Sequence, residues 1–303
     1  MIIDLPQTTT NDVAKRLVNL RDEGGAVALG RVLTLVIITE DQGLEDAVAA
    51  ANDASREHPC RIVVLAPSTS EGPGLDAQIR VGGDAGASEV VVLRPSGELG
   101  DHGDTLVMPL LLPDAPIVAW WPGTPPANPG ADRVGRMANR RITDALYAPA
   151  PRTAIERLRD HHVPGDTDLS WTRITLWRGI IAAALDQPPY DSVTSVRVEG
   201  QAGHPSVLLL AAWLGHQLQC PSSVGSTPGA PGITRVVLER RGGPIVIDRP
   251  DGETTTLSEP GKPERHISLP IRGLQECLAE ELRRLDPDEM FGEVLLDALH
   301  EVA

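Results

Sequence analysis

Residues 31–65 read RVLTLVIITEDQGLEDAVAAANDASREHPCRIVVL and carry the clearest structural signal in the chain. The stretch holds two β-branched, apolar runs, Val32–Ile38 and Arg61–Leu65, and each run suits a buried strand. Between them, residues 43–57 carry apolar side chains at helical spacing: Leu44, Ala47, Val48 and Ala51. A strand, a helix and a second strand of these lengths predict parallel strands covered by helices.

The same pattern extends over the first half of the chain. Further strands are expected at residues 78–81, 89–93 and 116–121, and amphipathic helices at 8–23 and 152–162. Thr10 or Asn11 can cap the first of these helices. The first half is therefore predicted to form a Rossmann-like α/β domain with a mostly parallel sheet.

The second half has a different order of elements. A helix starting after Thr167 or Asp168 carries the apolar stripe Ile174, Trp177, Ile181 and Leu185. A buried helix at 206–219 follows a strand at 193–198, and four short runs joined by Gly/Pro turns predict an antiparallel meander over residues 233–269. Two helices end the chain, and the second is expected to be capped by Asp286.

These elements predict a C-terminal α/β (α+β) domain with antiparallel strands and terminal helices. The turn Pro164-Gly165 separates the two patterns. We therefore expect an N-terminal domain at 1–164 and a C-terminal domain at 165–303.

Charge and composition narrow the classes of partner. The chain has 42 acidic and 27 basic residues among 303, a net charge of -15, which repels nucleic acid and anionic membranes. The longest apolar run, Val207–Leu214, is too short to span a bilayer, and the first residues do not resemble a signal peptide. Cys60, Cys220 and Cys277 lack metal-site or disulfide spacing, which fits a reducing cytoplasm. Whether any of them is redox-active stays open.

No catalytic constellation stands out in the sequence. Nucleophile elbows, phosphate-binding P-loops and HExxH zinc motifs are absent. The Gly-rich stretch at 82–88 lacks dinucleotide-binding spacing and is expected to be a tight turn. His161 and His162 would point about 100° apart on a helix, so a shared metal ion is not expected. The sequence thus predicts no catalytic residue, no cofactor and no metal.

The tryptophans suggest a partner surface. Neighbouring side chains on a strand point to opposite faces, so one member of the pair Trp120-Trp121 can fill the core while the other faces a loop, a second layer or a partner. Trp171 is expected at an exposed first helical turn near Arg173 and Arg178. Tryptophan and arginine are enriched at interface hot spots. We predict that Trp121, Trp171, Arg173 and Arg178 help to form a partner interface; the alternative is that Trp171 packs between the two domains.

Six segments resemble a known family in sequence and in order. They are GRVLTLVI (30–37), REHPCRIVVL (56–65), PLLLPDAPIVAWWPG (109–123), DTDLSWTRITLWR (166–178), VRVEG (196–200) and EELRRLDPDE (280–289). On these stretches the chain resembles the glucose-6-phosphate dehydrogenase assembly protein (OpcA) family of actinobacteria and cyanobacteria.

The resemblance implies a function that the residues alone do not give. Members of the family bind glucose-6-phosphate dehydrogenase, promote its active oligomer and activate it allosterically, which supports NADPH supply in the oxidative pentose phosphate pathway. It also implies two α/β regions and no catalytic role.

Two other readings compete with this one. An α/β enzyme acting on a nucleotide or phosphosugar would have a deep cleft at the carboxyl ends of its strands, lined by groups with perturbed pKa values. A purely structural subunit would change the assembly of the dehydrogenase without changing the activity of each assembled unit.

Overall fold

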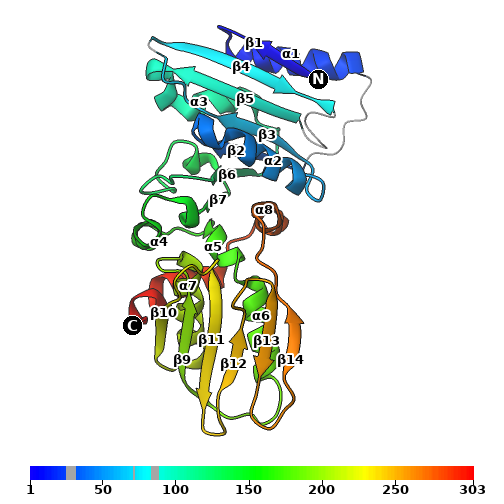
Figure 1. Ribbon diagram of the computed structural model, residues 1–303. Coiled ribbons are helices and arrows are strands. Elements are labelled where there is room, and N and C mark those ends of the chain that lie inside the picture. Colours follow the sequence, from blue (N-terminus) through cyan, green and yellow to red (C-terminus); the bar gives the residue numbers. More distant parts are fainter. Residues whose placement is uncertain (25–31, 71, 83–88) are drawn as a thin grey trace. The chain divides into compact units, whose positions relative to one another are not determined.

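The computed structural model describes residues 1–24, 32–70, 72–82 and 89–303 (Figure 1). The chain forms two compact units. The first contains Met1–Tyr147, Gly165–Thr167 and Leu274–Pro287, and the second contains Ala148–Pro164, Asp168–Gly273 and Asp288–Ala303. The domain boundary at 164/165 stays a prediction, and each unit is described by itself below.

An eight-stranded sheet forms the centre of the first unit, in the order β1-β4-β5-β3-β2-β6-β7-β8. The strands are β1 (Ile2–Leu5), β2 (Leu33–Ile38), β3 (Cys60–Leu65), β4 (Gly74–Arg80), β5 (Glu89–Ser96), β6 (Ile117–Trp121), β7 (Arg140–Thr143) and β8 (Asp166–Asp168). β5, β3, β2, β6 and β7 pair in parallel, whereas β1 and β4 add an antiparallel edge. The predicted α/β class with a mostly parallel sheet is confirmed.

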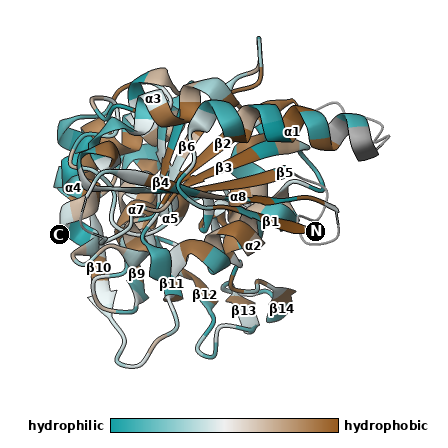
Figure 2. Cartoon of the chain, turned by 90° about the horizontal axis from the view of Figure 1, so that it is seen from above, coloured by the Kyte–Doolittle hydropathy of each residue, from teal (hydrophilic) through white to brown (hydrophobic). Residues whose placement is uncertain are grey.

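Helices cover both faces of this sheet, as Figure 2 shows with α1 on one side and α2 and α8 on the other. α1 (Thr10–Gly24) buries Val13 and Leu17 against alternate side chains of the strands, together with α3 (Gly103–Val107). α2 (Leu44–Ala54) packs against α8 (Leu274–Arg283) on the opposite face. Since the strands are buried on both faces, β2 and β3 are predominantly apolar rather than alternating, with Thr34 and Arg61 as the polar exceptions.

Several local details of the first unit differ from the prediction. Thr9 caps α1, because its hydroxyl accepts a hydrogen bond from the Asp12 amide at 3.2 Å, so the expected caps Thr10 and Asn11 were wrong. β1 and β7 were not predicted from the sequence. The Gly-rich stretch at 82–88 lies outside the described residues except for Gly82.

The second unit is built on a six-stranded sheet in the order β10-β9-β11-β12-β13-β14. These strands are β9 (Val193–Gly200), β10 (Ser222–Ser226), β11 (Ile233–Arg240), β12 (Ile245–Asp248), β13 (Thr254–Ser258) and β14 (Arg265–Ser268). β11 to β14 form the predicted antiparallel meander, and α7 (Pro205–Leu218) links the parallel pair β9 and β10. Figure 1 shows α6 and α7 on one face of this sheet.

The remaining helices of the second unit show two corrections. The helix expected over 168–185 is interrupted and forms α5 (Leu169–Thr172) and α6 (Thr175–Leu185), with Asp168 capping α5. α9 (Glu289–Glu293) is capped by Asp288, whose carboxylate accepts from the Phe291 amide, so the expected cap Asp286 was wrong. α4 (Pro151–Asp160) lies where it was predicted. Within the described ranges, no helix is both long and apolar enough to cross a bilayer.

Candidate functional site

A crevice of about 570 Å³ lies at the carboxyl ends of β2 and β6 in the first unit. From β2, the chain passes to β3 and β5 on one side of the sheet and later to β6 and β7 on the other side. The loops after β2 and β6 therefore diverge, which is the position where open α/β sheets bind ligands. Thr39 and Gly43 after β2, and Pro122 and Gly123 after β6, line the crevice at this point.

One wall of the crevice is an exposed face of α2. The buried face of the helix carries Leu44, Val48 and Ala51, whereas Asp46 and Asp53 are exposed and line the crevice together with Ala49. Asp46 and Asp53 are seven residues apart, which places them about 10 Å apart along the helix axis. Leu274 and Gln275 at the start of α8 also line the crevice, and we call it the α2–α8 crevice.

The loop before α2 holds this wall close to β2. A Cβ atom on Gly43 would lie 2.9 Å from the Thr39 hydroxyl oxygen, so a larger residue would have to displace that side chain. The loop and the first turn of α2 read TEDQGLED from Thr39 to Asp46. They carry four carboxylates and lack the glycine spacing with which a dinucleotide-binding loop approaches a pyrophosphate.

The charge of the crevice is negative. Among the described residues its lining contains the carboxylates of Asp46 and Asp53 but no Arg, Lys or His. Arg56 reaches Asp53 at 3.4 Å, but both side chains are exposed to solvent. A phosphate group would enter against two like charges with no cation to bind it, so the crevice favours neutral or cationic groups.

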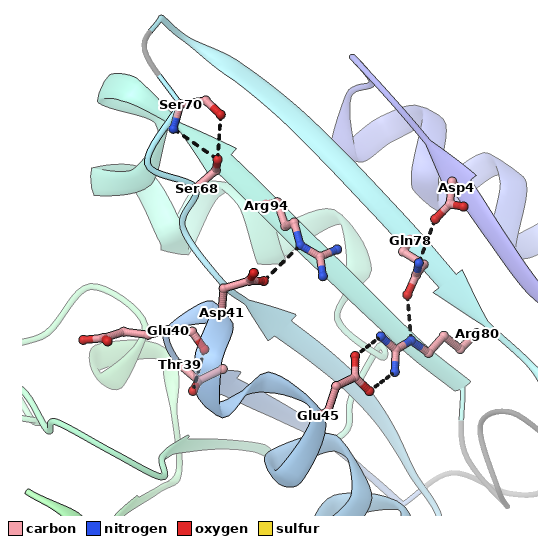
Figure 3. Close-up of polar contacts among 10 residues, drawn as sticks. All are labelled: Asp4, Thr39, Glu40, Asp41, Glu45, Ser68, Ser70, Gln78, Arg80 and Arg94. Carbon is pink, nitrogen blue, oxygen red and sulfur yellow. Dashed lines mark hydrogen bonds and ion pairs between the residues drawn. The ribbon is translucent and has the colours of Figure 1, made fainter.

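Ion pairs beside the crevice fix the first turn of α2 to the strands (Figure 3). The Arg80 guanidinium on β4 donates to both carboxylate oxygens of Glu45, at 2.8 and 2.7 Å, and to the Gln78 amide oxygen at 2.7 Å. Asp41 lies 3.4 Å from the Arg94 guanidinium. The hydrogen bonds from Arg80 lower the pKa of Glu45 below its ordinary value. These ion pairs therefore hold the start of α2 in a fixed position against the strands.

Two titratable groups with strongly shifted pKa values lie in the second unit. Burial, with the nearby charges of Arg173 and Arg249, lowers the pKa of His204 to about 4. Burial also lowers the pKa of Arg249 to about 10. Neither residue lines the α2–α8 crevice. In the part of the chain that the structure describes, no cluster of three or more His, Cys, Asp or Glu side chains is arranged to hold a metal ion.

The Trp120-Trp121 pair is buried on both faces of β6. Trp121 is 3% exposed and packs with Val13 and Leu17 of α1, and Trp120 on the opposite face is fully buried. Of the three options for the second indole, a loop, a second layer or a partner, a second layer of the same unit is the one observed. Because Trp121 is buried, it can affect a partner surface only indirectly, by supporting the exposed residues that pack over it.

Trp171 is buried rather than exposed, so the expectation of an exposed first turn was wrong. Its ring is 1% exposed, its indole nitrogen donates to an Asp288 carboxylate oxygen at 2.8 Å, and Phe291 lies 5.7 Å from it between ring centroids. The Arg178 guanidinium stacks over the ring at 3.9 Å from its centroid. Arg173 and Arg178 are half-buried. The structure thus brings Trp171 and Arg178 into contact, and the partner interface stays a prediction.

Cys60 and Cys277 are buried, and burial raises the pKa of the half-buried Cys220 thiol, which disfavours its reactive thiolate. His162 packs edge-on against Phe291 with 6.1 Å between ring centroids, so its ring takes part in packing.

These features define a two-unit α/β protein with a doubly wound sheet and an acid-lined crevice at its switch point. Comparison with protein families then gives a closer assignment. Residues 51–160 match the model described as the glucose-6-phosphate dehydrogenase subunit N-terminal domain, and residues 164–295 match the corresponding C-terminal domain. The chain belongs to the OpcA family of glucose-6-phosphate dehydrogenase assembly proteins.

Curated relatives agree with this assignment. Proteins called OpcA, described as candidate proteins of the OxPP cycle, are 27% identical over 67% of this chain in Nostoc punctiforme and 25% identical over 65% in a Synechocystis species. The matches cover 51% and 44% of those proteins, so the chain spans about half of the length of the curated relatives.

Solved structures share the general arrangement only distantly. An oxidoreductase from Sinorhizobium meliloti aligns over 88% of this chain and 95% of its own, with 13% identity and a TM-score of 0.46. A UDP-N-acetylglucosamine 3-dehydrogenase from Acidithiobacillus ferrooxidans aligns over 88% and 96%, with 9% identity and a TM-score of 0.37. Likeness at this level carries no argument about function.

Proposed function

We propose that this chain is a non-catalytic, cytoplasmic partner of glucose-6-phosphate dehydrogenase that promotes its active oligomer and activates it allosterically. This role would support NADPH supply in the oxidative pentose phosphate pathway. The observation that carries the proposal is the match of residues 51–160 and 164–295 to the two domains described as those of a glucose-6-phosphate dehydrogenase subunit.

The chemistry of the α2–α8 crevice supports a non-catalytic role. The substrate and the cofactor of the dehydrogenase both carry phosphate groups, and the crevice presents Asp46 and Asp53 to anything that enters it. An enzyme acting on a phosphosugar or nucleotide would need cations or oriented amide groups at this position. The competing enzymatic reading expects perturbed titratable groups in the cleft, whereas His204 and Arg249 lie elsewhere.

Activation by such a partner requires only a difference in affinity. An effector shifts the equilibrium of its target toward the state that it binds more tightly. A coupling free energy of about 1–3 kcal/mol corresponds to a 5- to 150-fold effect, which a modest surface can supply. Arg173 and Arg178 remain the proposed contact residues in the second unit, with the buried ring of Trp171 as their support. Trp121 remains a proposed support for a contact surface of the first unit.

Co-purification with the dehydrogenase, followed by kinetics and mass measurement, tests the proposal. We expect a stable complex, a larger fraction of active oligomer and a higher rate at limiting glucose 6-phosphate. A changed assembly with unchanged activity per assembled unit would instead indicate a structural subunit. Turnover of a phosphosugar by the isolated chain would refute the non-catalytic role.

A further inference from the structure

We propose that the α2–α8 crevice docks a basic segment of the dehydrogenase, in which two Arg or Lys side chains flank an apolar side chain. This inference rests on the proposed function and names the surface and the chemistry of the contact. It concerns the first unit, whereas the predicted contacts of Arg173 and Arg178 lie in the second unit.

The shape of the crevice suits a short protein segment. Its volume of about 570 Å³ is within the range of roughly 300–1,000 Å³ that is typical of binding pockets. Ala47, Ala49 and Ala50 form the α2 side with short side chains, so a partner can approach the helix closely. The start of α8 adds the apolar side chain of Leu274. An apolar anchor of the partner would lie against these groups.

The charges of the crevice select a basic occupant. Asp46 is exposed and makes no ion pair with the described part of the chain, and the pair of Asp53 with Arg56 is solvent-exposed and long at 3.4 Å. An exposed ion pair of this kind contributes little free energy, so a partner cation can replace Arg56 with only a small loss. Complementary charges across an interface fix its register and speed association.

The spacing of the two carboxylates fits a regular partner element. Asp46 and Asp53 are two helical turns apart, and a partner helix with basic residues at positions i and i+7 would match them. An apolar residue at i+3 or i+4 would then face the alanine side of α2. The ring of Tyr147, which is 60% exposed and lines the crevice, can stack on one of the cations.

A second copy of this chain is a poorer occupant. The chain carries a net charge of -15, and self-association through this crevice would bring further negative charge toward Asp46 and Asp53. Like charges placed against each other at an interface oppose binding. A basic segment of another protein avoids this repulsion.

Affinity measurements with the full chain and the purified dehydrogenase of the same organism test the inference. We expect Asp46→Lys combined with Asp53→Lys to weaken binding at least tenfold and to reduce its dependence on salt. Ala49→Phe, at an exposed position in the crevice, should weaken binding at least tenfold without changing the charge. Asp46→Asn combined with Asp53→Asn gives the same test with a smaller perturbation of the helix.

Glu98→Lys combined with Asp101→Lys is the matched control. Both residues are exposed in the same unit, outside the crevice lining, and the change in net charge is identical. We expect this control to bind within about twofold of the wild type. Equal losses in both charge-reversal variants, or full affinity of Ala49→Phe, would overturn the crevice as the docking site while leaving the proposed function intact. Failure of the wild-type chain to bind the dehydrogenase would overturn both.

Discussion

Arg80 on strand β4 holds Glu45 in the first turn of α2 through two parallel hydrogen bonds of 2.8 and 2.7 Å. The Arg80 side chain is 10% exposed, whereas the Glu45 side chain is 69% exposed. A bidentate ion pair of this kind fixes the relative orientation of the two side chains as well as the distance between them. It therefore ties the crevice-forming helix to a strand far away in the sequence.

Glu45→Gln should destabilise the first unit slightly and in a pH-dependent way. Because Arg80 lowers the pKa of Glu45 in the folded chain, the pair stabilises the fold above the ordinary pKa of a glutamate, and this contribution is lost as the pH falls through the lowered pKa. Since Glu45 is largely exposed, we expect a loss of only about 0.5–1 kcal/mol at pH 7. Urea unfolding at pH 7 and near pH 3 measures it.

The difference in stability between the two proteins should narrow as the pH falls, because protonation of the wild-type carboxyl removes the charge that Arg80 binds. Glu40→Gln is the control, because Glu40 is exposed and its carboxylate has no ion pair with the described residues. A difference between Glu45→Gln and the wild type that persists unchanged at low pH would contradict this account.

The sequence predicted β2, α2 and β3 closely because the forces that form them are local. Apolar runs and helical spacing are visible within 10 residues, and the parallel class follows from their order. β7 was missed because it reads Arg-Arg-Ile-Thr, and all four residues are buried. Arg141 pairs with Asp166 and Arg140 pairs with Glu281. No local sequence pattern indicates partners that lie so far away in the chain.

The candidate site was predictable only in part. Strand ends such as Trp121-Pro122 indicated the position of the loops, and the enzymatic reading placed a cleft at such strand ends. Leu274 and Gln275 reach the crevice from a helix more than 200 residues away from α2, which periodicity does not reveal. Trp171 was expected to be exposed because Phe291 and Asp288, which cover it, come more than 100 residues later.

Glu281→Ala should strongly destabilise the first unit. Arg140 and Glu281 are 2% and 8% exposed, and their ion pair joins β7 to α8. Removing the carboxylate leaves a buried guanidinium without its counter-charge, which costs about 3–5 kcal/mol. The midpoint of urea unfolding should fall accordingly.

Two comparisons isolate the buried charge as the cause. Arg140→Met combined with Glu281→Leu removes both charges and should recover most of the lost stability. Glu57→Ala breaks the exposed pair of Glu57 with Arg283, 3.4 Å apart, and should cost under about 1 kcal/mol. If Glu281→Ala and Glu57→Ala lowered the free energy of unfolding equally, burial would not determine how much each ion pair contributes to stability.

His204→Asn should flatten the pH dependence of stability between about pH 4 and pH 6.5. His204 caps α7 by accepting the Ser206 amide at its Nδ1 atom, which requires a neutral ring. Its folded pKa of about 4 lies below the ordinary value of 6.5, so its contribution is complete above pH 6.5 and is lost as the pH falls toward 4. The shift corresponds to roughly 3 kcal/mol across this range.

Asparagine keeps the cap without titrating in this range, because its side-chain oxygen can accept the same amide. Chemical unfolding at pH 7, 5.5 and 4.5 should therefore show a shallower slope for His204→Asn than for the wild type. His300→Asn, at an exposed position, is the control and should keep the wild-type slope. Parallel slopes for His204→Asn and the wild type would show that His204 does not sense pH in the fold.

Trp171→Phe and Arg178→Met separate a supporting role from direct contact with a partner. The phenylalanine loses the hydrogen bond to Asp288 but keeps an aromatic ring beside Phe291, so stability should fall by about 1–2 kcal/mol. Arg178→Met keeps the aliphatic cover and removes the cation over the Trp171 ring, at a cost of about 0.5–2 kcal/mol.

Since Trp171 is buried and Arg178 is half-buried, only the arginine change should lower affinity for the dehydrogenase beyond the effect on folding. Titrations of both variants at a temperature where each is fully folded measure this, and unchanged affinity for both would remove this part of α5 and α6 from the interface.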